Sequence, residues 1–243
     1  MPKDKLSKKT VKTAVKKTVK KPKTDAETVT EIVCVVDRSG SMEAIKSDAI
    51  GGFNNFLTDQ KKQPGSAIMT IVLFDHQYEI MCSGKPVNEV VPLTTDTFVP
   101  RGSTALLDAI GRTIVEVNKR NPSKAIITIL TDGQENSSHE FTKQQVKQMT
   151  DDCEKKGWAI IYLSADANAF EDGKSYGVGA SNIMSFAATP RGTNVCTMAA
   201  SYAASDYRQS GNIANMSVYS ARAGSFYDSS QSRTAQNTKK TLY

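Results

Sequence analysis

The sequence has few of the residues that form disulfide frameworks, zinc sites or membrane spans. Its 243 residues include four cysteines and two histidines, and no two cysteines form a Cys-x-x-Cys pair. Such usage disfavours a zinc site and indicates a reducing, intracellular compartment. The longest apolar runs, Ile32 to Val36 and Ala125 to Leu130, are far shorter than the ~20 residues that span a bilayer. We therefore expect no membrane association.

Positive charge is concentrated in residues 1–24, which hold ten lysines and one acid, whereas the rest of the chain has 21 bases and 24 acids. The motif KKTV occurs twice there, and no apolar stretch follows the charges, so we expect no secretory signal. We interpret residues 1–28 as a disordered, lysine-rich tail. Binding of nucleic acid or another polyanion through residues 1–24 is an alternative function.

Strand-like and helix-like segments alternate between residues 29 and 208. Nearly continuous apolar strands are predicted at 30–37, 66–75, 125–132 and 158–166, with shorter strands at 78–84 and 181–188. Helical periodicity is found around 45–57, 104–120, 140–157 and 192–208. This alternation predicts an α/β domain with a mostly parallel sheet that helices cover on both faces.

The last segment, residues 209–243, is rich in serine. We interpret it as a loosely ordered extension. Docking of this segment onto a partner remains a second interpretation because it contains four aromatic residues, Tyr219, Phe226, Tyr227 and Tyr243.

Oxygen-bearing side chains follow three of the predicted strand or loop ends. Asp37, Ser39 and Ser41 come directly after the first strand, Thr104 ends a long loop, and Asp132 follows a central strand. Ligands of open α/β sheets bind outside the carboxyl ends of the strands, so these five side chains can meet there. Two carboxylates and three hydroxyls are hard donors that suit Mg²⁺ or Mn²⁺. The pattern therefore predicts a divalent-cation site.

This set of residues resembles the metal-ion-dependent adhesion site (MIDAS) of von Willebrand factor type A (VWA) domains. The resemblance rests on D-x-S-x-S at 37–41, Thr104 in GSTALLDAIG and Asp132 in TDG, and it covers residues 29 to about 190. It implies a Rossmann-like three-layer sandwich with one short antiparallel edge strand. It also implies a module that binds a partner's Asp or Glu through Mg²⁺, with Ca²⁺ as another possible ion.

In the family, the two serines and Thr104 would ligate the ion directly, and the aspartates often act through water. The form of the motif looks more like intracellular phage and bacterial members than secreted adhesion proteins. The resemblance thus implies a cytoplasmic protein, in the host cytoplasm if it is phage-encoded.

Each residue also has a purely structural interpretation. Ser41 and Thr104 could cap helices, Asp132 could be a turn residue, and Asp75 could either support the metal site or be an ordinary loop acid. A calcium EF-hand is disfavoured because Met42 stands where its loop needs glycine. A phosphatase of the haloacid dehalogenase type would need an acid where Ser39 stands. A serine hydrolase lacks its G-x-S-x-G motif. We therefore expect no enzymatic activity.

Overall fold

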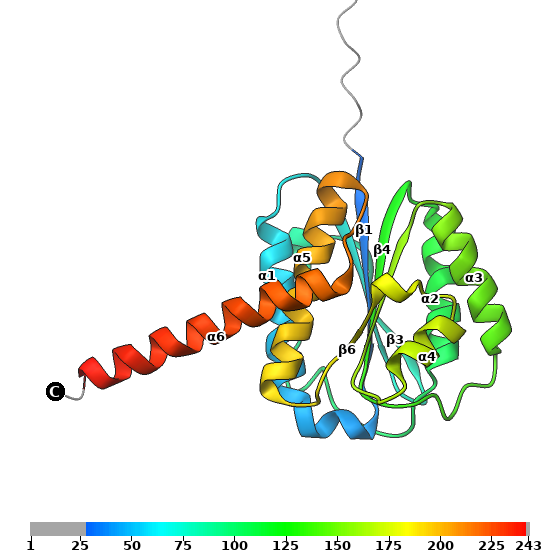
Figure 1. The fold of residues 1–243 in the computed structure, drawn as a ribbon. Coiled ribbons are helices and arrows are strands. Elements are labelled where there is room, and N and C mark those ends of the chain that lie inside the picture. The colour runs from blue at the N-terminus through cyan, green and yellow to red at the C-terminus, as the bar shows by residue number, and fades with distance from the viewer. Residues whose placement is uncertain (1–27, 242–243) are drawn as a thin grey trace, which may run out of the picture.

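The computed structural model describes the backbone of residues 28–241 and the side chains of residues 28–231. The lysine-rich segment 1–24, with its predicted disorder and polyanion binding, lies outside the described residues, as does Tyr243. Six strands form one sheet in the order β3-β2-β1-β4-β5-β6 (Figure 1). The strands are β1 (Thr30–Asp37), β2 (Ala67–Phe74), β3 (Tyr78–Pro86), β4 (Lys124–Thr131), β5 (Ala159–Ser164) and β6 (Ile183–Ser185). Within the described residues only the β2–β3 pair is antiparallel, which confirms the predicted fold class. The antiparallel edge strand β3 has nine residues, however, and is not short as expected.

Helices cover both faces of the sheet because the central strands are apolar on both sides (Figure 1). Alternate residues of β1 enter two separate cores: Ile32, Cys34 and Val36 on one face, Val33 and Val35 on the other. The first core is covered by α1 (Lys46–Lys62) and α5 (Pro190–Ser210), the second by α2 (Leu106–Arg120), α3 (Lys143–Lys155) and α4 (Ala169–Ser175). Three short 3-10 helices lie between these elements: η1 (Gly40–Ile45), η2 (Val87–Glu89) and η3 (Ala180–Asn182).

The strand order creates a crevice between β1 and β4. The chain leaves β1 toward β2 on one side, and it leaves β4 toward β5 on the other side, with α1 and α3 on opposite faces (Figure 1). At such a switch point the two connecting loops diverge and leave a hollow outside the carboxyl ends of the strands. Asp37 and Thr131 are the last residues of these two strands, so the sequence motif lies where the fold favours ligand binding.

Local signals explain several helix ends. The α3 helix begins with a capping box between Thr142 and Gln145, which satisfies two otherwise free amide groups. The α5 helix begins two residues earlier than predicted, because Thr189 caps it and Pro190 takes the first turn. The α2 helix begins at Leu106, so Thr104 lies in the preceding loop and not in the helix. The short α4 helix was not predicted.

The interpretation of residues 209–243 as loosely ordered is wrong for most of that segment, which forms α6 (Met216–Thr241). Met216, Tyr219 and Ala223, spaced three and four residues apart, are buried in the core that α1 and α5 cover. Tyr227 packs against the same core, whereas Phe226 is 60% exposed. The many serines hide this apolar stripe in the composition.

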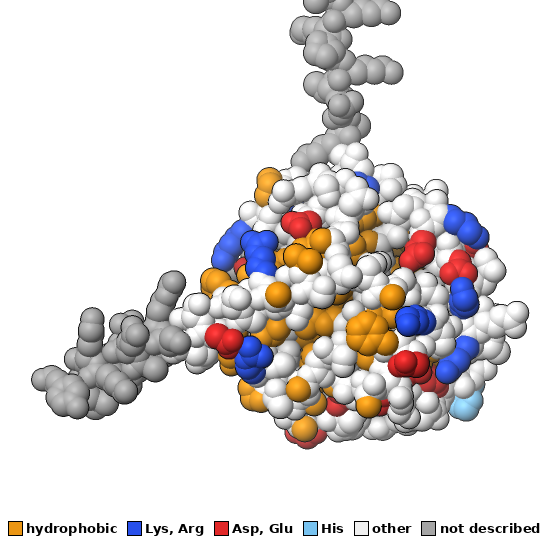
Figure 2. Space-filling model, in the orientation of Figure 1, with side chains coloured by type: hydrophobic (Ala, Val, Ile, Leu, Met, Phe, Trp, Pro, Cys, Tyr) orange, Lys and Arg blue, Asp and Glu red, His pale blue; other side chains and the backbone are white. Residues whose placement is uncertain are grey.

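The sheet ends on one side at β6, an edge strand of three residues. Figure 2 shows apolar side chains gathered on the surface between α6 and α4, over this edge. Met184 and Phe186 are nonetheless buried. A three-residue edge strand between two helices offers little backbone for pairing with another chain.

Candidate metal site at the ends of β1 and β4

Asp37 stands at the centre of the candidate site. Its side chain is fully buried at the end of β1. One carboxylate oxygen accepts a hydrogen bond from the amide of Ser39 at 2.6 Å, and the other accepts one from the hydroxyl of Thr131 at 2.5 Å. The carboxylate is therefore fixed between the loop that leaves β1 and the end of β4.

Hydroxyl groups converge beside this carboxylate. The Oγ atoms of Ser39 and Ser41 lie 3.1 Å apart, and the Ser41 hydroxyl donates to Asp132 Oδ1 at 2.7 Å. A Cβ placed on Gly133 would lie 3.3 Å from Thr104 Oγ1, 3.4 Å from Ser41 Oγ and 4.0 Å from Ser39 Oγ. Three hydroxyl oxygens thus surround one small space beside a glycine. The structure brings together all five residues that the motif predicts.

Thr104 reaches this space because its backbone is held on both sides. Its amide donates to Asn136 Oδ1 at 2.8 Å, and its carbonyl accepts from the amide of Asn136 at 3.0 Å. The next amide, that of Ala105, donates to the carbonyl of Asp75 at 2.9 Å. Asn136 was not predicted from the sequence. Its position four residues after Asp132, in the loop that follows β4, was the only available signal.

The capping interpretations of Ser41 and Thr104 do not fit these contacts. Ser41 lies inside η1, whose N-cap is Ser39, and the Ser39 side chain makes no capping hydrogen bond. The N-cap of α2 is Ala105, so Thr104 does not cap that helix. The hydroxyls therefore have no capping role that would explain their presence.

The charge of Asp37 lacks a partner within the described chain. Three carboxylates are fully buried: Glu31, Asp37 and Asp75. Glu31 pairs with Arg120, and Asp75 pairs with Arg38 and Arg101. Among the ion pairs of the described residues, none includes Asp37.

Burial raises the pKa of Asp37 to about 6, and the nearby charge of Asp132 adds to this effect, while hydrogen bonds from Thr131 and Ser39 oppose it. Burial also raises the pKa of Asp132. Both shifts reflect negative charge that is partly removed from water without compensation. A bound cation would supply that compensation and favour the ionised forms.

The residues present fit a hard divalent cation. The site offers two carboxylates and three hydroxyls, all oxygen donors, as Mg²⁺ and Mn²⁺ prefer. No cluster of three or more His, Cys, Asp or Glu side chains suited to a metal is found within residues 28–231. The buried members Asp37, Ser39 and Thr104 form the base, whereas Ser41 is exposed and opens the site to solvent.

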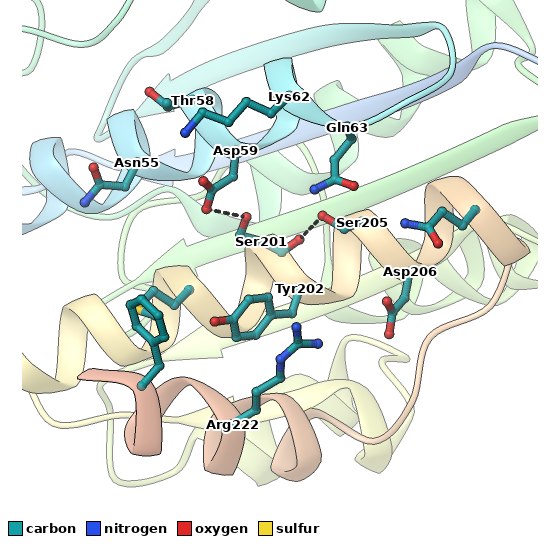
Figure 3. A pocket seen from close by; sticks show the side chains of 13 residues that line it. Asn55, Thr58, Asp59, Lys62, Gln63, Ser201, Tyr202, Ser205, Asp206 and Arg222 are labelled. Carbon is teal, nitrogen blue, oxygen red and sulfur yellow. Dashed lines mark hydrogen bonds between the residues drawn. The ribbon is translucent and has the colours of Figure 1, made fainter. Parts of the chain in front are cut away.

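A separate hollow lies away from this site. A groove of about 570 Å³ runs over α5 between α1 and α6 (Figure 3). Its lining carries both signs of charge, from Asp59 and Lys62 on α1, Asp206 on α5 and Arg222 on α6. The Arg222 guanidinium stacks 4.0 Å from the Tyr202 ring centroid. None of the five predicted site residues lines this groove.

No protein-family model and no curated protein matches the sequence. Among solved structures, the PilB minor pilin from Streptococcus sanguinis is 10% identical, with a TM-score of 0.53 over 74% of this chain and 62% of that one. This similarity shows a shared fold.

Two further structures have lower TM-scores. A von Willebrand factor type A protein from Catenulispora acidiphila is 14% identical with a TM-score of 0.48, over 76% of this chain and 42% of that one. Proximal thread matrix protein 1 from the mussel byssus, with a zinc-occupied MIDAS motif, is 20% identical with a TM-score of 0.42, over 57% and 36%. These scores are too low to support an argument about function, and the chain spans less than two thirds of each of the three structures.

Proposed function

We propose that this chain is a VWA-type domain that binds Mg²⁺ at the ends of β1 and β4 and, through it, an Asp or Glu of a partner protein. The observation that carries the proposal is the fully buried Asp37 carboxylate, which has hydroxyl and amide partners but forms no ion pair with a described side chain. A buried charge that the chain does not neutralise is costly, so such a position favours an external cation.

The five residues would bind the ion, balance its charge and leave one side open to the partner. Ser39, Ser41 and Thr104 would offer their hydroxyl oxygens to the ion, and Asp37 and Asp132 would balance its charge directly or through water. Two carboxylates neutralise Mg²⁺ without excess negative charge, so the ion keeps its attraction for an incoming carboxylate. The exposure of Ser41 supports approach of the partner from that side. Mn²⁺ or Ca²⁺ could replace Mg²⁺.

We propose that the domain is not an enzyme. A phosphatase that uses Asp37 as nucleophile would need an acid two residues later, and Ser39 stands there. The two histidines have other contacts. The His76 ring contacts the Asp75 carboxylate, and His139 is exposed, with its backbone amide bonded to Asp108. The site thus offers oxygen ligands for electrostatic binding.

We also propose a cytoplasmic location, in a bacterium or in the host of a phage. The four cysteines are free, and three of them are buried. That usage suits a reducing compartment. Separately, no helix within the described part of the chain is long and apolar enough to cross a membrane.

The experiment that tests this function is recovery of partners from the native host with and without EDTA. Wild-type protein should retain a partner with Mg²⁺ and lose it with chelator. Thr104→Ala and Asp37→Ala should lose the same partner even with Mg²⁺. A partner that survives both EDTA and Asp37→Ala would contradict the proposal.

A further inference from the structure

Asp75 lies one residue beyond β2, beside the candidate metal site. It is fully buried, and every one of its oxygens is engaged. Oδ2 accepts from Arg38 Nε at 3.0 Å and from Arg101 Nε at 3.1 Å. Oδ1 accepts from the amide of Gln77 at 2.7 Å and lies 3.1 Å from His76 Nδ1. The side chain therefore acts as a junction between several segments.

Two of these segments carry the predicted metal ligands. Arg38 lies between Asp37 and Ser39, so its guanidinium ties the loop that leaves β1 to Asp75. Arg101 ties the segment before Thr104 to the same carboxylate oxygen. The carbonyl of Asp75 also accepts from the amide of Ala105, the residue after Thr104.

Direct backbone contacts join the same two segments. The amide of Arg101 donates to the carbonyl of Arg38 at 2.9 Å, and the amide of Gly40 donates to the carbonyl of Gly102 at 3.2 Å. Gly102 has φ +65, and a Cβ there would lie 2.1 Å from His76 Nδ1. The loop is thus packed closely against the Asp75 junction, with no room for a side chain.

We infer that Asp75 is a positioning residue of the metal site. It fixes residues 37–41 relative to residues 101–105, so that the hydroxyls of Ser39 and Ser41 meet that of Thr104. This inference rests on the proposed function. Residues that orient metal ligands without touching the metal typically contribute ~10–100-fold to metal affinity.

The alternative is an ion pair that only stabilises the fold. Glu31 provides the matched control, because it is also fully buried and also pairs with an arginine, Arg120. It lies near the start of β1, at the opposite end of the strand from Asp37. Loss of either buried acid should lower the melting temperature, but only loss of Asp75 should weaken the metal site.

The test measures Mg²⁺ affinity of folded protein by isothermal titration calorimetry, for wild type, Asp75→Asn and Glu31→Gln. We expect the Kd of Asp75→Asn to rise ~10–100-fold and that of Glu31→Gln to stay close to the wild-type value. Equal affinity of wild type and Asp75→Asn would overturn the inference and leave the proposed function intact. Absence of Mg²⁺ binding by the wild type would overturn both.

Arg101→Ala keeps the test decisive if Asp75→Asn fails to fold. The Arg101 side chain is 46% exposed, so its removal leaves the buried Arg38–Asp75 pair in place. We expect a smaller increase in the Mg²⁺ Kd, on the order of several-fold, together with faster hydrogen exchange of the Ala105 amide. An unchanged Kd and unchanged exchange would contradict a positioning role.

Discussion

Asp37 and Asp75 stand at the ends of neighbouring parallel strands, and both are fully buried. The chain neutralises Asp75 with two arginines, whereas among the described residues Asp37 receives hydrogen bonds from Thr131 and Ser39 and no ion pair. The comparison separates two uses of a buried acid. A paired acid holds segments of the protein together, whereas we propose that the acid without a positively charged partner accepts a metal ion from solution.

The largest expected effect is a difference in the free energy of unfolding between a variant that loses a paired buried acid and one that loses the unpaired Asp37. Breaking the Glu31–Arg120 pair with Glu31→Gln should lower the free energy of unfolding by about 3 kcal/mol, because it weakens two charge-assisted hydrogen bonds from Arg120 to a buried carboxylate. Asp37→Asn removes a charge that has no cation, so the metal-free protein should keep its stability or gain some. Urea denaturation in EDTA measures both. An equal loss in the two variants would erase the distinction.

Mg²⁺ should reverse the cost of the Asp37 charge. At 100 times its Kd, a ligand that binds only the folded state adds about 2.7 kcal/mol. For a domain of this size, that raises the melting temperature by roughly 5–10 °C. Thermal denaturation with Mg²⁺ and with EDTA tests this in wild type and Asp37→Asn. Deletion of residues 1–24 should leave the shift unchanged, whereas a shift that persists in Asp37→Asn would place the cation elsewhere.

The stability of the metal-free protein should fall as the pH rises from about 4 to 6. The pKa of Asp37 is raised to about 6 from 3.8, so the folded state binds a proton that the unfolded state releases in this range. Protonated Asp37 therefore contributes stability below pH 4, and this contribution is lost as the pH passes 6. A shift of this size corresponds to a few kcal/mol at most. Asp37→Asn should flatten this part of the pH profile; an unchanged slope would assign it to another group.

Gly133→Ala should give the smallest effect, about tenfold weaker Mg²⁺ binding at nearly unchanged stability. The new Cβ would lie within 3.4 Å of the hydroxyls of Thr104 and Ser41, in the space that we assign to the cation. Gly51→Ala is the control, because nothing lies within 4 Å of its Cβ. Calorimetric titration compares the two, and equal affinities would show that the cation does not use this space.

Much of the fold could be predicted because its central strands are nearly continuous apolar runs, which parallel sheets require. The proximity of the five candidate site residues could be predicted because they fall at strand and loop ends that the topology brings together. The sequence left open whether Asp75 supports the metal site or is an ordinary loop acid. Its role depends on contacts with Arg38 and Arg101, which are 37 and 26 residues away. Such pairing follows from the loop conformation, which local sequence does not specify.

The α6 helix was missed for a different reason. Serine has a weak preference for helices, and the buried stripe Met216, Tyr219 and Ala223 contributes few strongly apolar residues to this segment. Its order comes from packing against α5, a tertiary effect that overrides local propensity. Asn136 was also missed because its role depends on tertiary contacts: its two hydrogen bonds to Thr104 span 32 residues.

The most direct measurement of the central claim is anomalous X-ray diffraction from crystals grown with Mn²⁺. Mn²⁺ favours the same oxygen ligands as Mg²⁺ and scatters anomalously. We predict one strong peak among the hydroxyl oxygens of Ser39, Ser41 and Thr104, with the carboxylates of Asp37 and Asp132 around it. Crystals saturated with Mn²⁺ that show no peak there would contradict the account.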